Sequence, residues 1–443
     1  MNTLTFPRGG VHPAENKKNT NQKNIEAIPL PKKVIIPLIQ HIGAPAKAIV
    51  NVGDKVLKGQ RIAEPSGYVS VAYHASTSGT VTQIASLPHP FGDSLPAIVI
   101  ESDGEDQWMY GMLKKVDPMG LSVEQIRETI QNLGIVGLGG AAFPTHVKLN
   151  PPKEMKIDTF ILNGVECEPY LTADHRIMLE DTRKIIQGIK IFMKVLGVSN
   201  GYIGIEENKP DAIELMKKET FDLPDIKVVA LKLKYPQGGE KQLIKAITGR
   251  EVPSGGLPGS VGCVVQNAAT AAAVADAVCE GIPLIERVAT ITGDSVNEPK
   301  NVRFRIGTPI SEIIDFCGGL KEDTAKVIMG GPMMGIAQYR LDVPAIKGTS
   351  GLLCLGENMV SKEMPTVCIK CARCVDACPI GLIPTTIGRL SQLRRFDDAK
   401  DFNALDCIEC GCCSYGCPSK IQLVQQIRTA KTKITAKLHS KKK

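Results

Sequence analysis

Aromatic residues and long apolar runs are scarce in this sequence. Its 443 residues include one Trp, eight Tyr and ten Phe, too few for the aromatic stacking platforms of proteins that bind single-stranded nucleic acid. The net charge of +7 is small for this length, which also argues against a nucleic-acid binder. The most apolar stretch, residues 262–285, is interrupted by Gln266, Asn267, Asp276 and Glu280, so it does not predict a membrane-spanning helix.

The start of the sequence lacks the features of a secretory signal. MNTLTFPRGG contains no apolar run and no cleavage site, and we therefore expect no signal peptide and no transmembrane segment. The chain is expected to be soluble and cytosolic, in a compartment where thiols stay reduced and free to bind metal. Its length exceeds what one hydrophobic core usually supports, which predicts about three domains.

Cysteine, by contrast, is abundant and clustered. Nine of the 14 cysteines fall in the runs CIKCARCVDACP and CIECGCCSYGCP. Both runs have the C-x2-C-x2-C-x3-C-P spacing of two-cluster ferredoxins, in which the fourth cysteine of each run binds the other [4Fe-4S] cluster. Structural zinc is the alternative, since paired C-x2-C motifs also build four-cysteine zinc sites. The full pattern in these runs is more specific than such pairs. The predicted ligands are Cys368, Cys371, Cys374 and Cys417 for one cluster, and Cys407, Cys410, Cys413 and Cys378 for the other.

The residues around these runs refine the prediction. Residues 379–406 have a helical pattern and are longer than the connector of compact bacterial ferredoxins, which favours an α-helical ferredoxin fold. Cys412 has no ligand role in this spacing. The remaining cysteines are expected to be small buried apolar side chains: Cys167, Cys263, Cys279, Cys317 and Cys354.

The second motif is the glycine-rich loop GLGGAAFPTHVK, at residues 137–148. Glycines permit positive φ and close approach, so successive N–H groups can converge on a phosphate. Lys148 would add a positive charge. The loop follows a predicted helix and not a strand, so the Rossmann dinucleotide fingerprint does not fit. A turn without a ligand is the alternative.

The order of predicted elements divides the chain into five parts. A capping box at Ser122 and Gln125 begins a stretch in which helices and strands alternate, including a long helix over residues 172–196. This stretch predicts a Rossmann-like open α/β sheet. The predicted parts are residues 1–120, rich in short strands; 121–285, the α/β sheet; 286–355, with the strand, strand, helix, strand order of a β-grasp fold; 356–427, with the cysteine runs; and 428–443, a basic tail.

Residues 41–60, HIGAPAKAIVNVGDKVLKGQ, resemble the barrel-sandwich hybrid of lipoyl and biotinyl carrier domains. Those carriers present a modifiable lysine at the tip of the central hairpin. The corresponding residues 64–69 here read EPSGYV and contain no lysine. We therefore interpret the region as a structural module without swinging-arm chemistry.

The glycine-rich loop resembles the flavin loop of the NADH-oxidising subunit of respiratory complex I and of hydrogenase diaphorases. NGVECEP at 163–169, YPQGGE at 235–240 and QNAAT at 266–270 are similar to further segments of that family. Ala142, Val165, Gly239 and Gln266 depart from its pattern, and the changes at Val165 and Gly239 fall on the predicted nicotinamide contacts. The resemblance implies that Gly137, Gly139, Gly140 and Lys148 hold the phosphate of a non-covalent FMN, that Asn163, Glu166, Asn267 and Thr270 surround the flavin, and that Glu168, Tyr235 and Glu240 face NAD(H).

The chain as a whole is similar to the RnfC subunit of the Rnf (Rsx) electron-transport complex. FPRGGVHPAENK near the start, the flavin segments, GGPMMG at 330–335 and both cysteine runs match in order. The resemblance implies a barrel-sandwich module, an FMN and NADH domain, a β-grasp SLBB domain and a ferredoxin domain with two clusters. It also implies membership of a ferredoxin:NAD oxidoreductase coupled to Na⁺ or H⁺ translocation, in which FMN exchanges hydride with NAD(H) and the clusters relay single electrons.

The same resemblance implies a peripheral position on the cytoplasmic face of the cell membrane. The implied partners are the other subunits of the Rnf membrane complex, ferredoxin or a ferredoxin-like subunit, and NAD(H), with no nucleic acid. One alternative is the cobalamin reductase of microcompartments, but that family carries the barrel-sandwich module after its clusters, whereas here it comes first. A non-catalytic electron-wire scaffold with a degenerate flavin loop is the other.

The basic end of the chain leaves two interpretations open. It contains Arg428, Lys431, Lys433, Lys437 and residues 441–443, all lysine, without an acidic residue. It is either a solvated tail or a contact for anionic lipid or an acidic partner.

Overall fold

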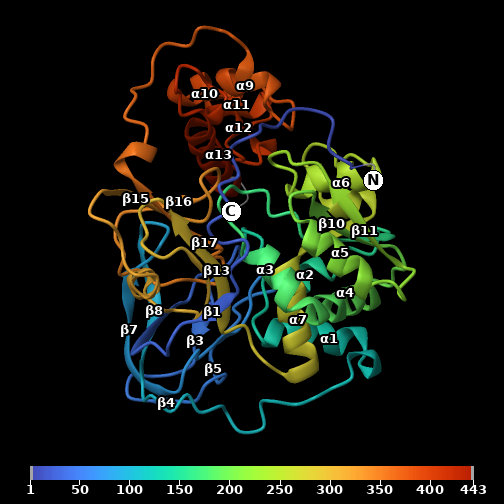
Figure 1. The fold of residues 1–443 in the computed structure, drawn as a ribbon, viewed down its shortest axis with the longest axis vertical. Helices are drawn as coiled ribbons and strands as arrows, with labels where there is room; N and C mark the ends of the chain where they lie inside the picture. Colours follow the sequence, from blue (N-terminus) through green and yellow to red (C-terminus); the bar gives the residue numbers. More distant parts are fainter. Residues whose placement is uncertain (1–2, 441–443) are drawn as a thin grey trace.

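The computed structural model describes residues 3–440, which form four sheets and a separate group of helices (Figure 1). The first unit, blue in Figure 1, contains two of these sheets. Its strands alternate buried and exposed side chains, as in β2, where Val34 and Ile36 enter the core. One sheet has the order β2 (Lys33–Pro37), β8 (Ser94–Ser102), β7 (Gly79–Pro88), β4 (Lys55–Val56), and the other β3 (Lys47–Ala48), β5 (Arg61–Glu64), β6 (Tyr73–His74).

The second unit is a parallel sheet with the strand order β11-β10-β9-β12. The chain proceeds outward from β9 to β11 and then returns to form β12 on the other side of β9. This reversal creates a topological switch point, where open α/β sheets bind their ligands. The elements are β9 (Thr159–Asn163), β10 (Gly201–Glu206), β11 (Ile226–Leu231), β12 (Cys263–Asn267), α1 (Val123–Asn132), α2 (Thr145–Lys148), α3 (Ala173–Glu180), α4 (Thr182–Leu196), α5 (Pro210–Glu219), α6 (Glu240–Thr248) and α7 (Ala268–Glu280).

One helix of this unit differs from the sequence prediction. The capping box of α1 forms as expected between Ser122 and Gln125, but the long helix predicted over 172–196 is two helices, α3 and α4. The break is at Asp181, which leaves helical geometry with φ −114° and ψ 26°. Its carboxylate pairs with Arg303 at 3.1 Å, a partner from a distant part of the chain that a local pattern cannot indicate.

The third unit is a six-stranded sheet of the β-grasp type with one helix, α8 (Ile310–Phe316). Its edge strand β1 comes from near the start of the chain and pairs in parallel with β14. The sequence analysis assigned no strand to these residues. In order across the sheet, the strands are β1 (Ile25–Ala27), β14 (Lys300–Arg305), β13 (Glu286–Gly293), β17 (Gly351–Gly356), β15 (Thr324–Met329) and β16 (Ile336–Gln338).

The helical unit at the top of Figure 1 contains both cysteine runs. The linker between the runs is helical, as predicted. Short 3₁₀ turns occur here and elsewhere, at Pro118–Gly120, Pro258–Val261, Glu357–Met359 and Ala404–Asp406. The helices are α9 (Arg373–Asp376), α10 (Pro384–Gln392), α11 (Phe396–Asp401), α12 (Cys412–Tyr415) and α13 (Leu423–Ser440).

The described part of the predicted basic tail is not a solvated coil. It belongs to α13, which packs on α10 and buries Ile427 and Ile434. Arg428 and Lys431 both pair with Glu409, at 2.9 and 2.6 Å. The apolar residues recur at helical spacing between the lysines, so the helix has one packed face and one basic face. Residues 441–443 lie outside the described residues.

No helix within residues 3–440 is both long enough and apolar enough to cross a membrane.

Candidate functional site

The switch point brings two predicted flavin contacts together. Asn163 ends β9, Asn267 ends β12, and the two residues are direct partners in the sheet register. The Asn267 side chain caps α7 by accepting hydrogen bonds from the N–H groups of Ala269 and Thr270. The Asn163 side chain accepts a hydrogen bond from Val165 N and donates one to Gly238 O at 2.9 Å. Both asparagines therefore also shape the loops around the site.

The glycine-rich loop is held against α7 and the β-grasp unit. Leu138 N donates a hydrogen bond to Thr270 Oγ1 at 2.8 Å, and Leu138 O accepts one from the Arg287 guanidinium at 2.6 Å. Gly139 is required by packing, because a Cβ there would lie 3.0 Å from Asn267 Cβ. Gly140 has φ +138°, and a Cβ there would meet no atom within 4 Å, so this part of the loop faces open space. The loop therefore leaves room for a ligand at Gly140.

Lys148 and Glu240, predicted to face different ligands, form an ion pair. Lys148 Nζ lies 2.6 Å from Glu240 Oε1 and also donates to Val265 O at 3.2 Å. About a third of each side chain is exposed. An incoming phosphate would therefore compete with Glu240 for the lysine.

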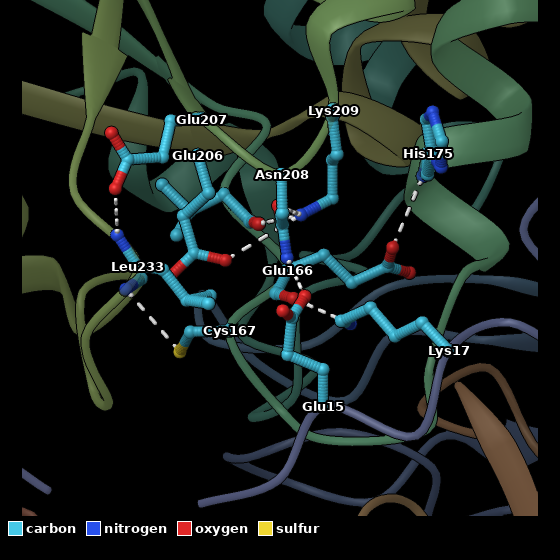
Figure 2. Close-up of polar contacts among 12 residues, drawn as sticks. Glu15, Lys17, Glu166, Cys167, His175, Glu206, Glu207, Asn208, Lys209 and Leu233 are labelled. Carbon is cyan, nitrogen blue, oxygen red and sulfur yellow. Dashed lines mark hydrogen bonds and ion pairs between the residues drawn. The ribbon is translucent and has the colours of Figure 1, made fainter. Parts of the chain in front are cut away.

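Glu166 acts as a cap for α3. Its carboxylate accepts hydrogen bonds from Asp174 N at 2.7 Å and His175 N at 3.2 Å, where the first-turn N–H groups of the helix need acceptors. Asp174 in turn accepts a hydrogen bond from Asn267 at 2.6 Å. Burial raises the pKa of Asp174 to about 7, and the negative charge of Glu166 adds to this effect. Figure 2 shows the densely hydrogen-bonded surroundings of Glu166.

Glu168 and Tyr235 contact other units of the molecule. The Glu168 carboxylate accepts hydrogen bonds from Met333 N at 3.1 Å and Met334 N at 2.9 Å, in the GGPMMG loop. Burial nevertheless raises the pKa of Glu168 to about 7. Tyr235 is 2% exposed, and its hydroxyl donates a hydrogen bond to Cys410 O at 2.8 Å. The second unit, with the parallel sheet, is called the flavin unit from here on. Two residues predicted to face NAD(H) are thus placed where this unit meets the β-grasp and helical units.

Four predicted cluster ligands line one hollow in the helical unit: Cys378, Cys407, Cys410 and Cys413. We call these residues the inner set. Burial, together with the negative charge of the nearby Cys410, Cys407 and Cys378 sulfurs, raises the pKa of Cys413 to about 12. Leu382 N and Glu409 N donate hydrogen bonds to two of the sulfurs, each at 3.4 Å. The set combines residues from both runs, as the cross-ligation pattern requires.

The other four, Cys368, Cys371, Cys374 and Cys417, are called the outer set. Burial raises the pKa of Cys374, and Cys417 and Cys368 are near enough to raise it further. Cys368 and Cys371 are exposed, whereas Cys374 is buried. Within the described residues, no three His, Cys, Asp or Glu side chains form a group that could hold a single metal ion. A cubane differs from a single ion because each cysteine binds a different iron atom.

The sequence analysis missed several residues of the site. Arg287, which holds the glycine-rich loop from the β-grasp unit, and Thr349, whose carbonyl accepts a hydrogen bond from Arg287, belong to no motif. Cys412, left without a role, is fully buried, with its sulfur 3.9 Å from Tyr235 O. Of the five cysteines expected to be buried, Cys167 and Cys279 are only partly so; the buried ones are Cys263, Cys317 and Cys354.

Family models match the chain in four consecutive regions. They are an RnfC barrel-sandwich hybrid domain at residues 4–105, the FMN-binding domain of Nuo51 at 130–276, an SLBB domain at 288–337 and a 4Fe-4S dicluster domain at 367–421. The C subunit of the proton-translocating ferredoxin:NAD(+) oxidoreductase complex of Clostridium ljungdahlii is 53% identical over 96% of this chain and 93% of that protein. The chain belongs to the RnfC family.

Other relatives agree with this assignment. The C subunit of the Na(+)-translocating complex of Acetobacterium woodii is 48% identical over 97% of both chains. The C subunit of the ion-translocating oxidoreductase complex of Rhodobacter capsulatus is 44% identical over 97% of this chain and 83% of that protein. A crystal structure of an NAD⁺-reducing [NiFe]-hydrogenase shares the fold at a TM-score of 0.50 and 17% identity, covering 72% of this chain and 63% of that chain.

The RnfC assignment also gives the cofactors. An FMN and two [4Fe-4S] clusters are the groups implied by the Nuo51-type and dicluster domains. The residues present fit them, because Gly140 faces open space, Lys148 is a partly exposed cation and the inner set lines a single cavity. The cobalamin reductase and scaffold alternatives receive no support.

Proposed function

We propose that this chain is the NAD(H)-oxidoreducing, electron-transferring subunit of an ion-translocating ferredoxin:NAD(+) oxidoreductase, with the residue roles described below. The C subunits of such complexes are its relatives. When bound, FMN exchanges two electrons with NAD(H) as hydride and single electrons with iron–sulfur clusters. The observation that supports these roles best is the hydrogen bond from Tyr235 to Cys410 O, since it joins a flavin-unit segment to the inner set.

The residues of the flavin unit bind and orient. Gly139 and Gly140 present backbone N–H groups to the FMN phosphate, and Lys148 neutralises part of its charge. Gly137, also predicted as a phosphate contact, instead shapes the loop, because its N–H donates to Phe143 O at 2.8 Å. Asn163, Asn267, Thr270 and Glu166 define the surface on which the flavin lies, at the end of β9 and β12. Glu168 and Glu240 are proposed to face NAD(H), and the pKa of about 7 lets Glu168 hold a proton near neutral pH.

The two cysteine sets have different places in the proposed electron path. The inner set is proposed to bind the cluster next to the flavin, because Cys410 contacts Tyr235. The outer set is proposed to bind the cluster that exchanges electrons with another redox protein, because Cys368 and Cys371 are exposed. Ferredoxin, or a subunit that carries ferredoxin-type clusters, is the partner that the reaction requires.

The location is proposed in the same way. A subunit of a complex that moves ions is associated with a membrane, and we propose that this chain binds peripherally on the cytoplasmic face, where NAD(H) and ferredoxin are found. The basic face of α13, with Lys433 and Lys437, is suited to anionic lipid or an acidic subunit.

Anaerobic isolation tests the cofactor roles. Iron, sulfide and FMN should be found at two cubanes and one flavin per chain, with NADH-dependent dye reduction. Lys148→Met should lower the FMN content while leaving iron unchanged, and Lys153→Met, at an exposed position of the same loop region, should leave both unchanged. Isolated chain that binds no flavin after reconstitution would contradict the proposal.

A further inference from the structure

The segment 4–17 runs along the junction between the flavin unit and the helical unit. It contains the FPRGGVHPAENK motif, for which the proposed function gives no role. It begins beside β11, where Leu4 N donates to Ala230 O at 3.1 Å and Leu4 O accepts from Lys232 N at 2.9 Å. In Figure 1 its dark-blue trace passes from beside α6 to the helices of the helical unit and then descends towards β1.

In its middle, this segment is bonded to both cofactor regions within two residues. Val11 exchanges two backbone hydrogen bonds with Tyr235, at 2.8 and 2.9 Å. Gly10 N donates to Ala377 O at 3.0 Å, and Ala377 directly precedes Cys378 of the inner set. Tyr235 itself contacts Cys410 through its hydroxyl. The segment therefore completes a second connection between the same two regions.

Two glycines make this close passage possible. Gly9 has φ +64°, and a Cβ on it would lie 2.5 Å from the carbonyl carbon and oxygen of Cys378. Gly10 has φ +86°, and a Cβ on it would lie 2.7 Å from Tyr235 O. Backbone atoms cannot yield as a flexible side chain can. A larger residue at position 9 or 10 would therefore push segment 4–17 away from the Cys378 peptide or from Tyr235.

The end of the segment holds the flavin side (Figure 2). Lys17 Nζ donates hydrogen bonds to Glu166 O and Glu168 O, each at 2.9 Å, and also to Leu171 O. Lys17 is only 7% exposed, so its ammonium group is matched to these carbonyls in a site with little water. Glu15 O accepts a hydrogen bond from Tyr170 N at 2.7 Å. Segment 4–17 therefore forms hydrogen bonds with the predicted flavin segment 163–169 and also with the peptide next to the inner set.

We propose that segment 4–17 is a positioning element that fixes the separation between the flavin-binding segments and the inner cluster. The proposal rests on the proposed function, because it assumes the flavin and cluster sites given there. Each NADH oxidised supplies two electrons, which leave the flavin one at a time, and one proton is released. The segment is proposed to act on these single-electron steps, since it bonds to main-chain carbonyls of the flavin segment and to the peptide that precedes Cys378 of the inner set.

The test is Gly9→Ala in the full-length, cofactor-loaded chain, with Gly197→Ala as its matched control. Gly197 has φ +66°, and a Cβ there meets no atom within 4 Å, so the control imposes the same backbone strain without the collision. Rapid mixing with NADH would follow flavin bleaching by absorbance and cluster reduction by freeze-quench EPR. We expect Gly9→Ala to leave flavin bleaching close to the wild-type rate but to slow cluster reduction severalfold, because electron tunnelling through protein weakens steeply as the distance between donor and acceptor grows.

A second variant covers loss of the cluster itself. If Gly9→Ala is isolated with less iron than wild type, the proposal is tested with Lys17→Met instead. Lys17 contacts no predicted cysteine ligand, and its loss removes hydrogen bonds only to residues 166–171. It should retain full iron and FMN and still slow cluster reduction, and Lys17→Arg should restore part of the rate. Cluster reduction at the wild-type rate in Lys17→Met, or in an iron-replete Gly9→Ala, would overturn the proposal. Failure of the proposed function would instead appear in wild type, as absence of flavin bleaching by NADH.

Discussion

The two cysteine runs have the same spacing but very different surroundings. In the first run, Cys368 and Cys371 lie at the surface, among exposed apolar residues such as Val367 and Ile369. In the second run, Cys410 and Cys413 are buried, and Cys410 is bonded to a tyrosine from the flavin unit. Identical local motifs therefore supply one protected site and one accessible site. The difference teaches that ligand spacing specifies the kind of cluster, whereas the neighbouring units specify what that cluster can exchange electrons with.

The largest effects are expected when one ligand is removed from each set, which tests whether the inner and outer sets have different roles. Cys410→Ser should abolish reduction of the remaining cluster by NADH, because the inner cluster is the proposed link to the flavin. Cys371→Ser should leave NADH-dependent reduction of the inner cluster intact while abolishing transfer to an external ferredoxin. EPR of the NADH-treated proteins measures both. Equal loss of NADH-driven cluster reduction in the two variants would contradict the inner and outer assignment.

Accessibility to an iron chelator should distinguish the sets without mutation. Under anaerobic conditions the outer cluster should lose iron severalfold faster than the inner one, because two of its cysteines are exposed, whereas all four of the inner set line one cavity and none of them is exposed. Iron release and EPR would be followed together. A single kinetic phase that removes both clusters would argue against the difference in protection.

Tyr235→Phe tests whether the hydrogen bond from Tyr235 to Cys410 O acts on the inner set alone. It leaves Cys410 O without its buried donor, and we expect the free energy of unfolding to fall by about 1–3 kcal/mol. The EPR signal of the inner cluster should shift while that of the outer cluster does not. Tyr415→Phe, at a 55% exposed tyrosine in α12, is the control and should change neither. A shift in both clusters would show that Tyr235 acts on the helical unit as a whole.

The smallest expected effect concerns pH. Burial raises the pKa of Glu168 from 4.5 to about 7, so the folded protein retains a proton that the unfolded chain releases between these values. Stability from this group is therefore present at low pH and is lost as pH rises towards 7. Between pH 5 and pH 7.5, wild type should lose about 1–2 kcal/mol more unfolding free energy than Glu168→Gln. Parallel pH profiles of the two proteins would contradict the raised pKa.

Much of the fold follows from local patterns. The capping box at Ser122 and the helical linker between the cysteine runs were predictable, because each depends on residues within a few positions of one another. The break at Asp181 was not, since no residue of the local pattern marks it, and the residue that pairs with the Asp181 carboxylate, Arg303, lies far away in β14. The helical packing of the basic end in α13 was not predicted, because its basic residues dominated the interpretation and its buried apolar residues, such as Ile427 and Ile434, are spread between them.

The candidate site shows the same division. Its motif residues were found from the sequence, yet Arg287 and Lys17 were not, because each acts on the main chain of a segment about 150 residues away. A hydrogen bond to a carbonyl places no demand on the identity of the residue that bears it, so the recipient segment contains no signal of its donor.

The sequence by itself determined the chemistry of this protein: two quartets of cysteine, a glycine-rich loop with a lysine, and the order of the four modules. These depend on spacing along the chain, which is visible without folding. Only the tertiary structure decided which cysteine set is protected, which residues hold the flavin loop, and how Gly9 and Gly10 bring the start of the chain against Cys378 and Tyr235. Burial and long-range hydrogen bonds arise when distant segments pack together, and the packing of one segment is set by all of the others.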